Sequence, residues 1–303
     1  MKIIKIFCIL SIIVIFSACD NTIPSDVCNE NKSSIPFQIK ESEEIEMRGK
    51  IMDQKQIGLG YSNIKGDKLI VLYNHEVKDN KTLTNFKYAV GNNGEVYLIK
   101  YLLYQEGSEN NNNRQTANNF NNQEGCIYEV IDASLIPDGT YILLCEEDYK
   151  EFSIFKVSEN SVKNSSSNEL NLRLEELANR ELKNRWIYSE YQNGLILSII
   201  EFESIGKDLL AWIMIEYNEM IKYYEFPATL SDNGYTGWKM GDCGNLNQYN
   251  NSIDIICTIQ NNQNIFVYFS WFSDESETIH VIEFLEDETP KSVILNGRYN
   301  YPE

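Results

Sequence analysis

The sequence predicts an all-β protein, on the basis of three observations. Short runs of β-branched and aromatic residues recur along the chain, from 68–73 to 278–285. Many of these runs are continuously apolar, as in 209–215, which indicates strands that are covered on both faces. Dipeptides that accept positive φ and close tight hairpins stand between several runs: Asn93-Gly94, Asp138-Gly139 and Asn193-Gly194. We therefore expect stacked sheets, either in a propeller-like arrangement or in a large β-sandwich.

The predicted strands are 68–73, 95–104, 140–145, 152–157, 195–202, 209–217, 221–226, 253–259, 265–272 and 278–285. The clearest hairpin covers 188–199, because a turn dipeptide separates two runs there. A faint internal repeat favours the propeller. Residues 206–212 followed by 223–226 resemble 262–268 followed by 281–284, and the two copies start 56 residues apart. Such a spacing is close to that of long propeller blades.

One segment departs from the β pattern and predicts an amphipathic helix over 168–185. Its apolar residues recur at helical spacing on one face: Leu170, Leu174, Leu177, Ala178 and Leu182. Ser166 and Glu169 form a capping box at its start. We expect this helix to pack on the edge of the β domain or to link two halves divided near 160–186. The alternative is a helix that binds a partner.

Segment 108–123 is low in complexity and dominated by asparagine. It lies between two β-favouring regions, so the sequence predicts a long hairpin loop. An asparagine-rich loop of this length is expected to be disordered.

The chain is strongly acidic, with 45 acidic and 26 basic side chains and a net charge of -19. Such a surface repels phosphate backbones and anionic lipid headgroups, so no nucleic-acid partner is expected. Acidity also favours solubility. Any membrane contact is expected to come from a lipid rather than from a basic patch.

The N-terminus has the pattern of an export signal. Residues 1–5 include two lysines, and an apolar run over 6–16 follows. This run is shorter than the roughly 20 residues that span a bilayer. Two small residues, at positions 17 and 18, come directly before Cys19.

Residues 1–20 resemble the signal of bacterial lipoproteins, in which small residues precede a cysteine that becomes acylated. Phe16 stands where that family prefers leucine. The resemblance implies that 1–18 is a signal peptide and that Cys19 is lipidated after cleavage. It also implies an extracytoplasmic location in the bacterial cell envelope, anchored to a membrane through lipid. Residues 19–35 are polar and predict a flexible tether, which leaves 36–303 as a single β-rich domain.

Export places the remaining cysteines in an oxidising compartment, where pairing is expected. Proximity in the sequence favours Cys126 with Cys145 and Cys243 with Cys257. Each bond would close a modest loop and contribute about 3 kcal/mol to stability, although spacing does not prove the connectivity. Cys28 remains, in the tether, either free or paired between chains. No C-x-x-C motif occurs, so the sequence does not predict a thioredoxin-type site or a four-cysteine zinc site.

No catalytic motif stands out. The two histidines, His75 and His280, lie in or beside predicted strands and are interpreted as ordinary strand residues. The carboxylates are too numerous for the sequence to select the pair that a glycosidase needs. Asp232 and Asp242 are weak candidates for binding calcium, and no other cofactor is predicted. Trp238, in a glycine-rich segment, is the candidate for stacking on a ligand.

These features together predict a membrane-tethered, non-enzymatic domain that binds a protein or a glycan. The alternative is a carbohydrate-active or other hydrolase that uses carboxylate chemistry, and a third hypothesis is a structural envelope lipoprotein without a small ligand. Three or more acids with raised pKa values converging in a pocket would favour the enzyme. A flat or aromatic exposed patch without a cleft would favour the binding domain.

Replacing Cys19 with alanine removes the thiol that the lipid would modify. We expect this variant to leave the membrane fraction, whereas the unchanged chain sediments with membranes. Immunoblotting of both fractions after ultracentrifugation measures the difference, and Cys28→Ala serves as a matched control that keeps the anchor. Continued membrane association of the Cys19→Ala variant would contradict the lipid anchor.

Overall fold

The computed structural model describes residues 57–71, 82–158, 168–217, 220–233, 236, 238, 246, 253–273, 276–286 and 288–299. The chain divides into two compact units, Met1–Glu43 and Glu44–Glu303, and all described residues belong to the second. Several residues that the sequence singles out lie outside the described part: Cys19, Cys28, His75, Asp242 and Cys243. Within the described ranges, no helix is long and apolar enough to cross a membrane.

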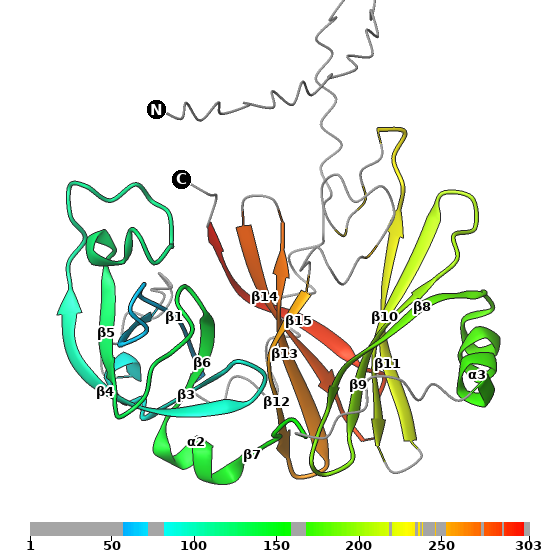
Figure 1. Ribbon diagram of the computed structural model, residues 1–303, viewed down its shortest axis with the longest axis horizontal. Helices are drawn as coiled ribbons and strands as arrows, with labels where there is room; N and C mark the ends of the chain where they lie inside the picture. The colour runs from blue at the N-terminus through cyan, green and yellow to red at the C-terminus, as the bar shows by residue number, and fades with distance from the viewer. Residues whose placement is uncertain are drawn as a thin grey trace, which may run out of the picture. The chain divides into compact units, whose positions relative to one another are not determined.

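The fold is all-β, as predicted, and its strands form a closed barrel and two antiparallel sheets (Figure 1). The barrel consists, in spatial order, of β1 (Gly58–Ser62), β2 (Lys68–Val71), β5 (Gly125–Val130), β4 (Glu95–Gln105), β3 (Tyr88–Gly91) and β6 (Thr140–Leu144). The four-stranded sheet has the order β11 (Met220–Thr229), β10 (Asp208–Tyr217), β9 (Ile196–Phe202) and β8 (Leu182–Glu190).

The five-stranded sheet has the order β15 (Lys291–Tyr299), β14 (Ser276–Phe284), β13 (Asn264–Phe272), β12 (Ile253–Asn261) and β7 (Ser153–Ile154). The helical segments are η2 (Thr82–Thr84), η3 (Phe120–Asn122), α2 (Glu146–Glu151) and α3 (Asn168–Ala178). The turn dipeptides lie where the sequence predicts them. Asn93-Gly94 closes β3 onto β4, Asp138-Gly139 joins β5 to β6, and Asn193-Gly194 joins β8 to β9.

The two open sheets share one apolar core, in the manner of a sandwich, and the described strands form no ring of blades. On β10, alternate residues face this core: Leu209, Ala211, Ile213 and Ile215. The residues between them form a second cluster, together with Leu174 of α3: Leu210, Trp212 and Met214. This coverage of both faces explains why the run over 209–215 is apolar throughout.

The five-stranded sheet is also covered on both faces. On β13, Ile265, Val267 and Phe269 face the sandwich core. Phe266 and Tyr268 face the other way and form a cluster with barrel residues: Leu59, Val90, Ile142 and Leu144. The barrel, which the sequence does not predict, therefore occupies the second face of this sheet.

The internal repeat corresponds to two similar hairpins in the two sheets. β10 begins at Asp208 and β13 at Asn264, while β11 begins at Met220 and β14 at Ser276, so both pairs are offset by 56 residues. Leu209 and Ile265, which occupy equivalent places in the repeat, lie in the same core. The repeat thus reflects two antiparallel meanders that pack together, not a series of propeller blades.

The helix is shorter than the sequence predicts. It ends at Ala178 because Asn179 adopts a left-handed conformation with φ 51°, which is a common helix stop. β8 then begins at Leu182, whose backbone N–H donates to the Glu175 side chain. Prediction of helix over 179–185 was therefore wrong, although Leu170, Leu174, Ala178 and Leu182 do gather on one cluster.

The asparagine-rich segment 108–123 is ordered, contrary to the prediction. Its side-chain amides form hydrogen bonds with one another and with the backbone. Nδ2 of Asn119 donates to Oδ1 of Asn111 (3.0 Å) and to the Arg114 carbonyl (2.8 Å). Nε2 of Gln123 donates to the same two acceptors. Phe120, between them, is buried against Tyr61. Composition alone predicts disorder because it does not reveal these paired amides.

The disulfide expected between Cys126 and Cys145 is not formed, and both are free thiols. Their strands, β5 and β6, are not neighbours in the barrel, because two strands separate them in either direction. Cys126 packs in the barrel core, and Cys145 caps α2, accepting from Asp148 N. Cys257 is also a free thiol, buried in the cluster between barrel and sheet, and its predicted partner Cys243 lies outside the described residues.

His280 lies on β14, as predicted, and stacks on Phe269 with 5.1 Å between ring centroids. Burial lowers its pKa from 6.5 to about 4.

Between these two values the unfolded chain binds a proton that the folded chain does not, so stability should fall as the pH decreases from 6.5 to 4. Urea unfolding at several pH values should show a weaker pH dependence for His280→Gln. An NMR titration that places the pKa of the assigned His280 imidazole near 6.5 in the folded chain would contradict this.

Candidate ligand-binding cavity

Polar residues follow the apolar ones along the barrel-facing side of the five-stranded sheet. On β13, Phe266 and Tyr268 lie in the apolar cluster, and Ser270 comes next on the same side. On β14, Ile279 lies in that cluster, and Glu277 comes next on the same side. The strand alternation therefore places a polar group at one end of this otherwise apolar interface.

The register of the strands brings three more residues to this end. Asp254 on β12 pairs with Ser270 on β13. Phe272 pairs with Glu277, and Glu277 pairs with Arg298 on β15. Because directly paired residues project on the same side of a sheet, these five side chains share one face.

A cavity of about 320 Å³ opens over this face. Its opposite wall comes from the barrel: Asn92 beside the β3–β4 turn, and 136–141 from the β5–β6 turn and the start of β6. Small-molecule sites in proteins commonly enclose about 300–1,000 Å³. The cavity is therefore large enough for one small ligand or one unit of a longer one.

A buried arginine fixes one side of the cavity. Arg298 is 4% exposed, and its Nε donates to the Glu277 carboxylate. Nη1 donates to Oδ1 of Asp138 at 3.0 Å and to the Gln115 carbonyl at 3.3 Å, and Nη2 donates to the Asp138 carbonyl at 2.7 Å. The guanidinium also lies over the Tyr61 ring, 5.1 Å from its centroid. These contacts tie the C-terminal strand to the barrel.

Two of the three carboxylates that line the cavity are thus held by one guanidinium. Burial by itself lowers the pKa of Arg298, but Glu277 and Asp138 outweigh burial and raise it. The second oxygen of Glu277 accepts from the Ser270 hydroxyl. The charges of Glu277 and Asp138 are therefore committed to internal contacts.

Asp254, the third carboxylate, has no cationic partner among the described residues. Its Oδ1 accepts from the Tyr188 hydroxyl at 2.6 Å. The Asp254 side chain is in contact with solvent. The protein around it nevertheless removes part of its hydration, which raises the pKa of Asp254, and the negative charge of Glu277 raises this pKa further. Across the cavity, the Thr140 hydroxyl oxygen is buried, and it has no hydrogen-bond partner in the part of the chain that the structure describes.

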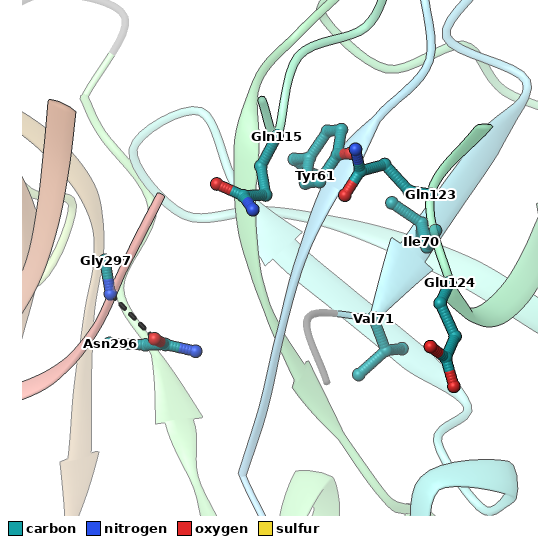
Figure 2. Close-up of a pocket in the computed structure, with 8 residues that line it drawn as sticks. All are labelled: Tyr61, Ile70, Val71, Gln115, Gln123, Glu124, Asn296 and Gly297. Atoms are coloured by element: carbon teal, nitrogen blue, oxygen red, sulfur yellow. Dashed lines mark hydrogen bonds between the residues drawn. The ribbon is translucent and has the colours of Figure 1, made fainter. Parts of the chain in front are cut away.

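A second, smaller cavity of about 120 Å³ is lined by Tyr61, the residue whose ring Arg298 covers (Figure 2). Tyr61, which is 1% exposed, contributes a hydroxyl that has no hydrogen-bond partner among the described residues. Figure 2 shows Tyr61 between Gln115 and Gln123, with Asn296 and Gly297 on the opposite wall. A polar space of this size holds a few water molecules, at roughly 30 Å³ each, which would satisfy the tyrosine.

The residues that the sequence proposes for ligand binding lie elsewhere. Trp238 is buried, not exposed. Its Nε1 donates to the Phe226 carbonyl at 3.1 Å, and its own carbonyl accepts from Trp271 Nε1. Asp232 is exposed and paired with Lys207. Within the described ranges, no group of three or more metal-ligating side chains occurs.

Sequence reasoning missed Asp254, Glu277 and Arg298. A signal for Glu277 exists in the alternation of β14, where a polar residue continues an apolar face. The chain contains 45 acidic residues, so this signal does not stand out. Asp138 was identified as a turn residue, and φ of 59° confirms the turn, but nothing in the sequence indicates its contact with Arg298.

The fold and the site define a β-rich protein with a cavity, lined in part by three carboxylates, where a barrel meets a five-stranded sheet. Comparison with protein-family models, with curated protein sequences and with solved structures finds no match to this chain. Its function is therefore inferred from the residues that line the cavity.

Replacing Arg298 with methionine leaves Glu277 buried without its cation. We expect the free energy of unfolding to fall by about 3–5 kcal/mol, as for other broken buried pairs. Lys207→Met is the matched control, since its pair with Asp232 is exposed and should contribute less than about 1 kcal/mol. Urea denaturation of both variants measures the difference. Equal, small losses in both would contradict a structural role for Arg298.

Proposed function

We propose that this chain is a lipid-anchored, extracytoplasmic protein that binds a glycan in the cavity between the barrel and the five-stranded sheet. The observation that supports this most directly is the lining of that cavity. It combines amide, hydroxyl and carboxylate groups with the aromatic ring of Phe272: Asn92, Thr140, Ser270 and Asp254. Sugar hydroxyls bond to such polar groups, and the apolar face of a sugar ring packs on aromatic side chains.

A concave site of this kind supports a glycan more than a flat protein surface. A protein partner of ordinary affinity buries roughly 800 Å² on each side, usually over a broad patch. A cavity of about 320 Å³ instead suits a single sugar unit inserted from a longer chain. Export and a lipid anchor at Cys19 would place this site among the glycans of the cell envelope.

The alternative, hydrolysis by carboxylates, has one point in its favour. Three acids converge in the cavity, and the pKa of Asp254 is raised by burial. Glycoside hydrolysis ordinarily uses two carboxylates across the scissile bond. Since Arg298 holds Asp138 and Glu277, Asp254 is the one carboxylate in the cavity left for a ligand, and this favours binding over catalysis.

Asn92→Ala removes an exposed amide that lines the cavity. We expect the full-length chain to bind at least one class of oligosaccharide on a glycan array, and this variant to bind it at least tenfold more weakly. Isothermal titration of the selected oligosaccharide measures the change. Asp232→Asn, which alters an exposed acid outside the cavity, should bind normally.

Two results would contradict the glycan proposal. One is the absence of any oligosaccharide ligand for the folded, full-length chain. The other is a ligand whose affinity is unchanged by Asn92→Ala and also by Asp254→Asn, since both residues line the cavity.

A further inference from the structure

We propose that Asn193, at the tip of the β8–β9 hairpin, is a site of spontaneous deamidation, and that the fold suppresses the same reaction at Asn93. The sequence contains four Asn-Gly pairs, which begin at Asn93, Asn193, Asn233 and Asn296. A glycine after asparagine has no side chain to hinder attack by its backbone nitrogen on the amide. Because the dipeptide is the same in each pair, the structure around it decides how readily the reacting atoms meet.

The reaction needs only the chain and water. The backbone nitrogen of Gly194 loses its proton to solvent and attacks Cγ of Asn193, so that a bond from nitrogen to Cγ forms. The bond from Cγ to the amide nitrogen then breaks, and ammonia leaves behind a cyclic succinimide. Water opens one of the two carbonyls of this ring, which gives aspartate or isoaspartate at position 193 and adds one negative charge.

The hairpin tip leaves Asn193 and Gly194 open to solvent. Both residues are exposed, as is Gln192 before them. Gly194 has a φ of 85°, and apart from its chain neighbours no atom lies within 4 Å of the position that a Cβ on it would occupy. Packing therefore does not oppose the movement of this nitrogen toward Cγ.

The hydrogen bonds at this tip are compatible with the reaction. Oδ1 of Asn193 accepts from the Leu195 N–H at 3.2 Å, and a donor at this oxygen stabilises the negative charge that develops on it during attack. The Gly194 N–H donates to the Tyr191 carbonyl at 2.9 Å. A hydrogen bond at an exposed turn opens at little cost in free energy, which releases the nitrogen.

The same dipeptide at Asn93 is held on several sides. Its Nδ2 donates to Oγ of Ser189, and its Oδ1 accepts from the Tyr191 hydroxyl at 3.0 Å. The nitrogen that would attack, on Gly94, donates to the Ile256 carbonyl at 3.3 Å. Closure of the succinimide ring would break these contacts between the barrel and the two sheets, so the folded chain protects Asn93.

Strand pairing restrains a third pair, Asn296-Gly297. Both residues lie in β15 and pair with Ile279 and Thr278 on β14, which keeps the backbone extended. The Gly297 N–H donates to Oδ1 of Asn296 at 2.8 Å. Deamidation here would require part of β15 to separate from β14, so we expect it to be slower than at Asn193. The fourth pair extends beyond the described residues, because its glycine is not among them.

Isoaspartate at position 193 would disturb the hairpin. It moves a methylene from the side chain into the main chain of a short turn, whose length sets the register of β8 and β9. Tyr191, at the base of this turn, donates through its N–H to the Leu195 carbonyl at 2.8 Å. Its hydroxyl also bonds to Asn93 and to Thr258. The modification would therefore weaken the link between this hairpin and the barrel.

An internal comparison of two identical dipeptides tests this proposal. The full-length chain is incubated at pH 8 and digested, and the peptides that contain Asn193 and Asn93 are quantified by mass spectrometry, since deamidation adds one mass unit. We expect Asn193 to react at least tenfold faster than Asn93 in the folded chain. In concentrated urea, which removes the protection of Asn93, the two rates should agree within threefold.

Two results would overturn the proposal. Equal rates in the folded chain would show that the fold does not protect Asn93, and a tenfold ratio that persists in urea would show that neighbours in the sequence set it. Asn193→Gln is the matched control for the consequence. The urea midpoint of the unchanged chain should fall as isoaspartate accumulates, whereas an equal fall in the variant would exclude position 193 as its cause.

Discussion

Burial of the five-stranded sheet on both faces is the constraint on which the other parts of the structure depend. One face forms a sandwich with β8–β11, and the other packs against the barrel. Each face needs an apolar partner, because apolar side chains left in water cost about 25 cal/mol for each Å². Gly94, at the tip of the β3–β4 turn, shows how closely the barrel approaches. Its N–H donates to the Ile256 carbonyl, and a Cβ there would lie 2.2 Å from the Phe155 carbonyl oxygen.

The candidate site exists because this apolar packing stops before the sheet does. Beyond Tyr268 and Ile279, the same face presents Ser270 and Glu277, and the barrel no longer fills the space above them. Arg298 compensates the buried charge of Glu277 and joins it to the barrel through Asp138. A pair of this kind is costly to desolvate, so it stabilises the fold only as a complete network. The same network leaves one carboxylate, Asp254, available to a ligand.

Local chemistry predicted most strands and several turns, but it missed four strands and misjudged two other segments. The predictions missed β1, β3 and β5, which are short or begin or end in glycine, and β15, whose alternation is interrupted by Asn296-Gly297. They also extended α3 through Asn179, where the backbone turns left-handed. Segment 108–123 was wrongly predicted to be disordered, because its side-chain amides are held by hydrogen-bond partners that come together only in the folded loop.

The sequence by itself determined the all-β class, the tight turns and the double coverage of the strands, since these depend on residues close together in the chain. Its N-terminal pattern also carries the prediction of a lipid anchor at Cys19. The tertiary structure alone decided the barrel, the free state of Cys126 and Cys145, and the cavity. Asp138, Asp254 and Arg298 come from three separate regions of the chain, and only the register of the strands brings their charges together.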